Sequence, residues 1–208
     1  MPVNRRRFLA LAMGFPAVAS ANVIAPVTQA TSDLVGTLIS RAAAPRHSSE
    51  VWVLIDDQTS SLSIFRGSDR IEHFLPISRG TGGARTHRVR GDSTTPLGEF
   101  RIYRFNNQSK WRIFIGIDYP TPAHARMALE TGIYTQADYE AYFDEYRRHG
   151  YPPQNTALGG AIGIHGIGTS DPQIHGRYHW TQGCIAVNNQ QIDRIASLVD
   201  VGTRVVIR

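Results

Sequence analysis

The fold and chemistry expected of this chain depend on two segments, Ile164-His165-Gly166 and Thr181-Gln182-Gly183-Cys184-Ile185-Ala186-Val187. Each contains a short apolar strand flanked by glycine, with the histidine or the cysteine at the edge of that strand. Fifteen residues separate His165 from Thr181. If the two strands are neighbours, the loop between them folds back and brings the imidazole of His165 to the thiol of Cys184.

A histidine beside a cysteine suits nucleophilic catalysis. The thiolate is the attacking species, and with an unperturbed pKa of about 8.5 it needs a nearby base at neutral pH. Gly183 would let a substrate carbonyl approach the backbone, where amide N–H groups around Cys184 bind an oxyanion. Taken singly, Cys184 is explained by burial as a small hydrophobe and His165 by a structural role. Together, at this spacing, they favour catalysis.

The rest of the sequence predicts a mainly β fold. Short runs of apolar and β-branched residues are separated by turn residues, as in a strand meander. A loop rich in glycine and arginine occupies residues 79–91. We expect strands at 51–55, 62–65 and 71–77, a strand through Tyr103, and further strands at 161–165, 184–187 and 203–207.

Two helices interrupt this β pattern. Thr135 and Asp138 have the spacing of a helix-capping pair, and Gly150 followed by two prolines marks a helix end. Between them four aromatic residues recur at helical spacing, namely Tyr139, Tyr142, Phe143 and Tyr146. We therefore expect a helical insertion at about 134–149, with its aromatic face packed on the sheet, and a C-terminal helix at about 190–199.

The order His, 14–17 residues, Ser/Thr-x-Gly-Cys resembles the signature of the L,D-transpeptidase catalytic domain, also called the YkuD-type domain. The segment Thr95-Pro96-Leu97-Gly98-Glu99-Phe100 is similar to the Thr-Pro-x-Gly-x-Phe strand entry of that family. The resemblance covers roughly residues 49–208. It implies a β-sandwich with the nucleophile in a cleft at one end.

The resemblance also implies roles for individual residues. Cys184 would attack the carbonyl that links the third residue of a peptidoglycan stem peptide, usually a diamino acid, to a terminal D-Ala. His165 would be the general base, oriented by the backbone carbonyl of Gly166, and the N–H groups of Gly183 and Cys184 would bind the oxyanion. The acceptor would be the amine of another stem, a lipoprotein lysine, a free D-amino acid or water. No cofactor or metal is implied.

The chain departs from the family pattern at two positions. Many members have histidine where this chain has Gln182 and arginine where it has Ala186. Gln182 cannot act as a second base, and with Thr181 it is expected to contact the substrate. The missing arginine leaves the group that binds a substrate carboxylate open. The arginines that could replace it are Arg177, Arg85, Arg88 and Arg90.

Ala186 and the long insertion at 119–153 look like a subgroup that includes hydrolases of the lipoprotein–peptidoglycan linkage. A hydrolase of the same fold, with water as acceptor, is therefore the main alternative to a transpeptidase. A metal-dependent peptidase built on His165, His175, His179 and Cys184 is disfavoured, because Gly176 and the lack of a nearby glutamate do not suit a zinc helix. A non-catalytic wall-binding module is a further alternative.

The N-terminus predicts export. Arg5-Arg6-Arg7 precede an apolar run at 8–19, and Ala19-Ser20-Ala21 has the small-x-small pattern of a cleavage site. About a dozen apolar residues are too few to span a bilayer. The segment 4–9 resembles the twin-arginine motif, and an ordinary secretory signal is the alternative. We expect an export signal at 1–21 cleaved after Ala21, a linker at 22–48 with at most one short helix near 31–42, and a catalytic domain at 49–208.

Charge does not point to nucleic acid. The whole chain has a net charge of +5, from 22 basic and 17 acidic residues, and one cysteine, which excludes an intramolecular disulfide. Removing residues 1–21 takes away three arginines and no acid, which leaves (22 − 3) − 17 = +2. The partner that the resemblance implies is the peptidoglycan stem, with a wall-linked lipoprotein as a further candidate, and the predicted export signal implies the periplasm or cell envelope.

Overall fold

The computed structural model describes residues 37–39 and 41–208. The predicted export signal and the predicted linker up to residue 36 lie outside these residues. Residues 37–39 and 41–42 are helical, in the stretch where the sequence allows one short helix. Within the described part of the chain, no helix is long and apolar enough to cross a membrane.

The described residues form an eight-stranded mixed sheet in the order β3-β2-β1-β10-β6-β7-β8-β9. The pairs β1–β10 and β8–β9 are parallel, and the other neighbours are antiparallel. Two short strands, β4 (Ala84–Arg85) and β5 (Thr95–Pro96), pair separately. The strands of the large sheet are β1 (Val51–Asp56), β2 (Ser61–Arg66), β3 (Asp69–Phe74), β6 (Gly98–Ser109), β7 (Arg112–Ile117), β8 (Gly163–His165), β9 (Ile185–Ala186) and β10 (Arg204–Ile207).

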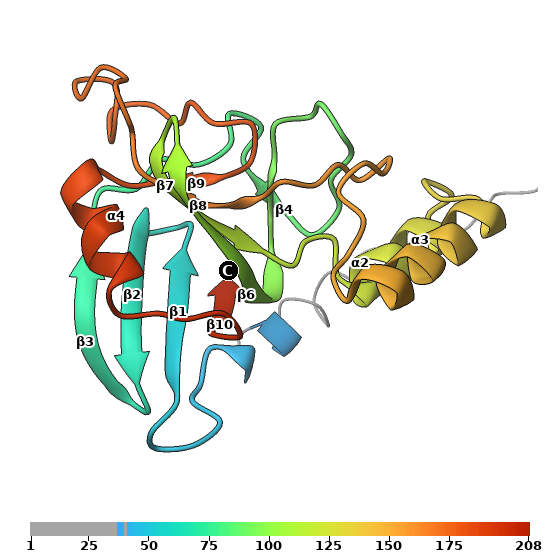
Figure 1. The fold of residues 1–208 in the computed structure, drawn as a ribbon, viewed down its shortest axis with the longest axis horizontal. Coiled ribbons are helices and arrows are strands. Elements are labelled where there is room, and N and C mark those ends of the chain that lie inside the picture. The colour runs from blue at the N-terminus through green and yellow to red at the C-terminus, as the bar shows by residue number, and fades with distance from the viewer. Residues whose placement is uncertain (1–36, 40) are drawn as a thin grey trace, which may run out of the picture.

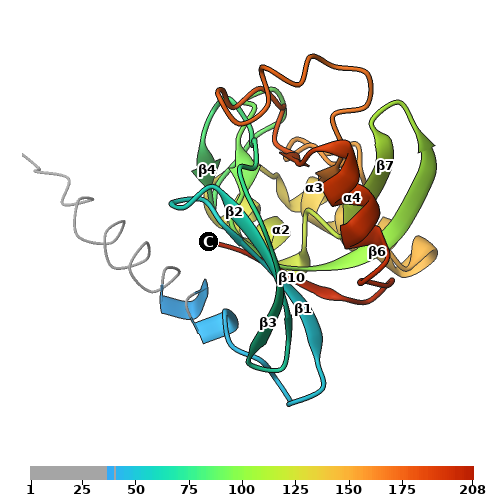
Figure 2. The same ribbon diagram turned by 90° about the vertical axis from the view of Figure 1, so that its left-hand side faces the viewer.

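The sheet changes direction at β6, whose 12 residues serve two different neighbours. Residues 98–101 pair with β10, and residues 102–109 pair with β7. Figure 2 shows β1 and β3 on one side of β10, and β6 and β7 on the other. Apolar side chains from both parts meet in one core, among them Val53, Ile64, Ile102 and Ile115. The predicted mainly β fold is confirmed.

Three helices flank the sheet, with α2 (Pro122–Glu130) and α3 (Gln136–His149) at one end of the molecule and α4 (Asn189–Ala196) at the other (Figure 1). The two predicted helices correspond to α3 and α4. Thr135 and Asp138 form a reciprocal capping box at the start of α3, and Gly150 ends it with a left-handed φ of 75°. Tyr142 is buried, and its hydroxyl donates to the carbonyl of Pro120 at 2.7 Å.

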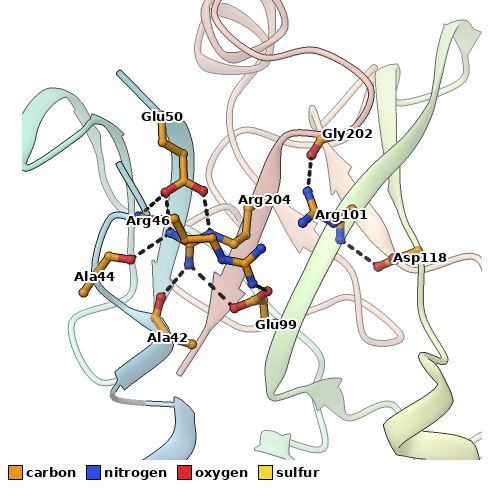
Figure 3. Close-up of polar contacts among 9 residues, drawn as sticks. All are labelled: Ala42, Ala44, Arg46, Glu50, Glu99, Arg101, Asp118, Gly202 and Arg204. Carbon is orange, nitrogen blue, oxygen red and sulfur yellow. Dashed lines mark hydrogen bonds and ion pairs between the residues drawn. The ribbon is translucent and has the colours of Figure 1, made fainter. Parts of the chain in front are cut away.

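Arg204 of β10 is only 2% exposed, although it is charged. Its Nε and Nη2 donate to the carboxylate of Glu50 at 2.8 and 3.0 Å (Figure 3). Nη1 donates to the carbonyl of Ala42 at 2.5 Å and Nη2 to that of Ala44 at 2.8 Å. The guanidinium also lies 4.8 Å from the centroid of the Trp52 ring. These five residues, the Arg204 cluster, tie the segment that precedes β1 to the middle of the sheet.

Candidate active site

His165 is the last residue of β8 and is 3% exposed. Its Nδ1 lies 2.7 Å from the carbonyl oxygen of Gly166. A carbonyl can only accept, so Nδ1 carries a proton and Nε2 is the basic nitrogen. Burial lowers the pKa of His165, and the bond to Gly166 opposes this shift. The imidazole is therefore neutral at pH 7, with the tautomer that a general base requires.

Three aromatic rings surround this imidazole. The centroid of Trp111 lies 5.1 Å from that of His165, and the ring of Trp180 packs edge-on at 5.8 Å. Phe114 of β7 stacks at 6.4 Å, directly across the strand pair. Aromatic walls restrict the rotation of the imidazole and lower the polarity around it. This packing is consistent with the lowered pKa of His165.

The position after His165 accepts only glycine. A Cβ on Gly166 would lie 2.7 Å from Oδ1 of Asn189 and 2.8 Å from the carbonyl oxygen of Trp111. The Asn189 side chain is itself fixed, because its amide donates to the carbonyl of Gly168 at 2.8 Å and its oxygen accepts from the Gly168 N–H at 2.9 Å. The start of α4 thus holds the loop whose carbonyl orients His165.

Cys184 immediately precedes β9, the strand next to β8. The parallel register pairs His165 with Ala186. Cys184 lies two residues before Ala186, just outside the paired part of β9. His165 thus ends one strand and Cys184 directly precedes its parallel neighbour at one edge of the sheet.

The thiol of Cys184 is uncharged at neutral pH. Its Sγ lies 3.4 Å from the carbonyl oxygen of Ala161, a contact in which the protonated thiol donates. Burial raises the pKa of Cys184 to about 11, which a backbone hydrogen bond from Gly163 and the charge of Arg88 oppose. The site therefore pairs a neutral thiol with a neutral imidazole.

The turn before Cys184 is organised by Thr181. Its Oγ1 accepts from the Gly183 N–H at 3.1 Å and donates to the Cys184 carbonyl at 2.6 Å. Thr181 is buried, so its hydroxyl shapes the turn from inside. Gly183 has a φ of 123°, which favours glycine, and a Cβ there would lie 2.8 Å from Nη1 of Arg88.

A cavity of about 440 Å³ opens beside Cys184. Gln182, which is exposed, lines this cavity. Two residues of the loop at 79–91 also line it, the buried Arg88 and the exposed Arg90. Two of the arginines suggested by the sequence lie elsewhere: Arg85, in β4, and Arg177 are both exposed and do not line this cavity. The structure thus places two of the four candidate arginines next to the thiol.

The opposite wall of the cavity is held by Gln154. Its Oε1 accepts from the Ala161 N–H at 2.6 Å, and its Nε2 donates to the carbonyls of Pro152 and Tyr119 at 2.8 and 3.1 Å. Ala161 has a left-handed φ of 54°, which is uncommon for a residue with a side chain. This strained residue supplies the carbonyl that the Cys184 thiol contacts.

The other two histidines of the disfavoured metal site have partners of their own, although the charge of His175 also lowers the pKa of His165, after the larger effect of burial. His175 lies 3.3 Å from Oγ of Ser78, and Nδ1 of His179 accepts from the Arg79 N–H at 3.3 Å. Among the residues that the structure describes, no three His, Cys, Asp or Glu side chains are grouped closely enough to hold a metal ion.

The tryptophans beside His165 and the role of Gln154 were not predicted from the sequence. Trp111 and Trp180 carry no motif; their only signal is that each is a large aromatic residue in an otherwise polar turn. Gln154 follows Pro152-Pro153, where the sequence indicated only the end of a helix.

Comparison with known families identifies the class of protein that this fold and site define. The family model of the L,D-transpeptidase catalytic domain (YkuD) matches residues 50–207. The chain belongs to this family. No curated protein matches it.

Solved structures that resemble the fold include those of two bacterial proteins, Pgp2 and Bd1075. The helical cell shape determining protein Pgp2 from Campylobacter jejuni, as a K307A mutant, is 15% identical, with a TM-score of 0.54 over 82% of this chain and 52% of that one. Bd1075 from Bdellovibrio bacteriovorus is 19% identical, with a TM-score of 0.50 over 79% of this chain and 50% of that one. The chain thus spans about half the length of these proteins, and the likeness concerns the fold alone.

Proposed function

We propose that the chain is a cysteine-dependent L,D-transpeptidase that forms an acyl-enzyme on Cys184. The observation that carries this proposal is the pairing of β8 with β9. This pairing joins β8, which ends at His165, to the strand that follows Cys184. Nδ1 of His165 contacts the Gly166 carbonyl, which leaves Nε2 basic, and Cys184 lines a cavity. Membership of the family supports the same reaction.

In the proposed reaction, Nε2 of His165 takes the proton of Cys184 as the sulfur attacks a peptide carbonyl. Because burial disfavours both the thiolate and the imidazolium, proton transfer accompanies the attack rather than preceding it. The C–N bond then breaks, and the imidazolium returns its proton to the leaving amine. An acceptor amine or water attacks the thioester and regenerates the thiol.

The proposed oxyanion donors are the N–H groups of Gly183 and Cys184. The Gly183 N–H already donates to Thr181 Oγ1, so it has to be shared with the oxyanion or released to it. Thr181 acts in this scheme by shaping the turn. Gln182, which lines the cavity, contacts the substrate.

The proposed substrate is the peptidoglycan stem peptide, cut between a diamino acid and a terminal D-Ala, in the periplasm or envelope to which the predicted signal would send the protein. The alternative is a hydrolase of the same fold, including one that releases a wall-linked lipoprotein. Ala186, in place of the arginine that many members have, and the insertion at 119–153 favour that alternative.

Mature protein, incubated with tetrapeptide stems and with a lipoprotein-linked muropeptide, tests the proposal by product masses. A 3–3 crosslinked product supports the transpeptidase, and a tripeptide without crosslink supports the hydrolase. We expect Cys184→Ala to abolish either product and His165→Ala to lower the rate by about 10² to 10⁴, the usual contribution of a general base. His149→Ala, in an exposed histidine at the end of α3, is the matched control.

Unchanged turnover by Cys184→Ala contradicts the acyl-enzyme. Trapping of the intermediate provides a direct check, since a carbapenem adduct on Cys184 adds its own mass to the intact protein. Inhibition by chelators without loss on alkylation of the thiol would favour a metal-dependent reaction instead.

A further inference from the structure

Arg88 is a buried cation without a complete set of partners. It is 5% exposed, and its Nε and Nη1 form no hydrogen bond with any residue that the structure describes. A charged group removed from water is unfavourable unless it is paired and hydrogen-bonded. The fold therefore holds a guanidinium whose donors remain to be satisfied.

The nearest carboxylate does not satisfy it. Asp92 lies 3.9 Å from Nε of Arg88, which is beyond hydrogen-bond length. The Asp92 oxygens already accept from the backbone N–H of Val89 and from the N–H and hydroxyl of Thr94, at 2.8 to 2.9 Å. Tyr119 supplies the other neighbour, with its ring centroid 5.3 Å from the guanidinium carbon. Asp92 orders the loop and the Tyr119 ring packs against the guanidinium, but neither accepts a hydrogen bond from Nε or Nη1 of Arg88.

Two glycines from other parts of the chain make room for this side chain. A Cβ on Gly183 would lie 2.8 Å from Nη1 of Arg88, and a Cβ on Gly159 would lie 3.4 Å from Nη2. Both glycines also have a positive φ, at 123° and 77°. The guanidinium thus occupies space that a side chain at position 159 or 183 would take.

The cavity that Arg88 lines is the one that holds Cys184. Arg90 lines it as well, and none of the described residues that line it is acidic. A guanidinium presents its donors in a planar fork that matches a carboxylate. At 186, where many family members carry arginine, this chain has alanine, whose side chain has no donor.

We propose that Arg88 binds a carboxylate of the acyl donor next to the nucleophile. The identity of that donor rests on the proposed function; the carboxylate subsite itself rests on the geometry of Arg88. Since the guanidinium and the thiol share one cavity, the carboxylate lies close to the scissile carbonyl. It is either the C-terminal carboxylate of the leaving residue or a side-chain carboxylate of the diamino acid.

Alkylation of the chain's one cysteine tests the subsite without any peptide substrate. Iodoacetate carries a carboxylate, and iodoacetamide has nearly the same size without the charge. We expect the ratio of their rates with Cys184 to be roughly tenfold higher in the wild type than in Arg88→Gln, since a charge-assisted hydrogen bond is lost. Arg88→Lys keeps the charge but loses the planar pair of donors, so we expect its rate ratio to lie between those of the wild type and Arg88→Gln. An equal ratio in the wild type and Arg88→Gln overturns the proposal.

Two controls protect this comparison. Arg66→Gln removes an exposed arginine at the end of β2, far from β8 and β9 in the strand order, and keeps the wild-type ratio. Circular dichroism verifies the fold of each variant. If Arg88→Gln does not fold, the ratio of the native wild type is compared with that of the same chain in urea. A native ratio no higher than the unfolded one contradicts the subsite.

Peptide substrates then distinguish the two sources of the carboxylate. Amidation of the bound carboxylate raises KM in the wild type and has little effect in Arg88→Gln, so tetrapeptides amidated at the C-terminus or at the diamino-acid side chain identify it. If no peptide is processed while the iodoacetate preference persists, the proposed reaction fails and the subsite stands. If peptides are processed with no dependence on Arg88, the proposed reaction stands and the carboxylate subsite fails.

Discussion

Arg88 and Arg204 are two buried arginines in nearly the same physical setting with opposite degrees of satisfaction. They are 5% and 2% exposed, and each lies over an aromatic ring, Tyr119 and Trp52 respectively. Yet Arg204 donates to a carboxylate and two backbone carbonyls (Figure 3), whereas two of the nitrogens of Arg88 form no hydrogen bond with any described residue.

The difference shows how one residue type serves structure in one place and a site in another. The partners of Arg204 come from the segment just before β1, so its donors are used to hold the chain. The surroundings of Arg88 are two glycines, a ring and a carboxylate that is already engaged. Burial alone therefore does not separate the two roles; the number of satisfied donors does.

Removing Arg204 should have the largest effect on stability. Arg204→Met leaves the Glu50 carboxylate, whose side chain is 11% exposed, without its partner. We expect the free energy of unfolding to fall by about 3–5 kcal/mol, as for other broken buried ion pairs. Urea denaturation measures it. If the free energy of unfolding falls less in Arg204→Met than in Glu50→Gln, Arg204 does not hold the segment before β1 against the sheet.

Glu50→Gln should have an intermediate effect that depends on pH. The hydrogen bond from Arg204 is the main cause that lowers the pKa of Glu50 from 4.5 to about 2. Its contribution is fully present above pH 4.5 and is lost as the pH falls towards 2. We expect a loss of about 1–3 kcal/mol at neutral pH. The difference from the wild type should shrink between pH 5 and 3 in urea titrations; a constant difference contradicts this origin.

Arg88→Met should have the smallest effect on stability. The methionine keeps most of the apolar stem and removes donors that are unsatisfied in the protein, so we expect a change within about 1 kcal/mol of the wild type. Thermal and urea unfolding check this value. A loss as large as that of Arg204→Met would show that Arg88 is structural, and the contrast between the two arginines would collapse.

Local patterns predicted those elements whose signals are strong within the chain itself. The first two strands have dense apolar runs, and α3 has both of its caps and an aromatic stripe. α2 was missed because Thr121 makes no side-chain capping bond and the buried face is mostly alanine. The polar end of β6, with Asn106 and Gln108, does not favour a strand, and its pairing with β7 imposes one.

The candidate site was predictable to the same degree. The motif predicted neighbouring strands at 161–165 and 184–187; β8 and β9 are parallel neighbours there, although β9 begins one residue after Cys184. Nothing in the local sequence separates Arg88 from Arg85, three positions earlier. The burial of Arg88 is decided by Gly159 and Gly183, which lie far along the chain, so only the fold distinguishes them.

The rings around His165 also give the protein an optical property. Of its three tryptophans, Trp111 and Trp180 lie within 5.8 Å of the imidazole, and Trp52 stacks on Phe65 inside the Arg204 cluster. A protonated imidazole quenches the emission of an indole that it touches. We therefore expect the emission of Trp111 and Trp180 to fall when His165 is protonated, and that of Trp52 to stay unchanged.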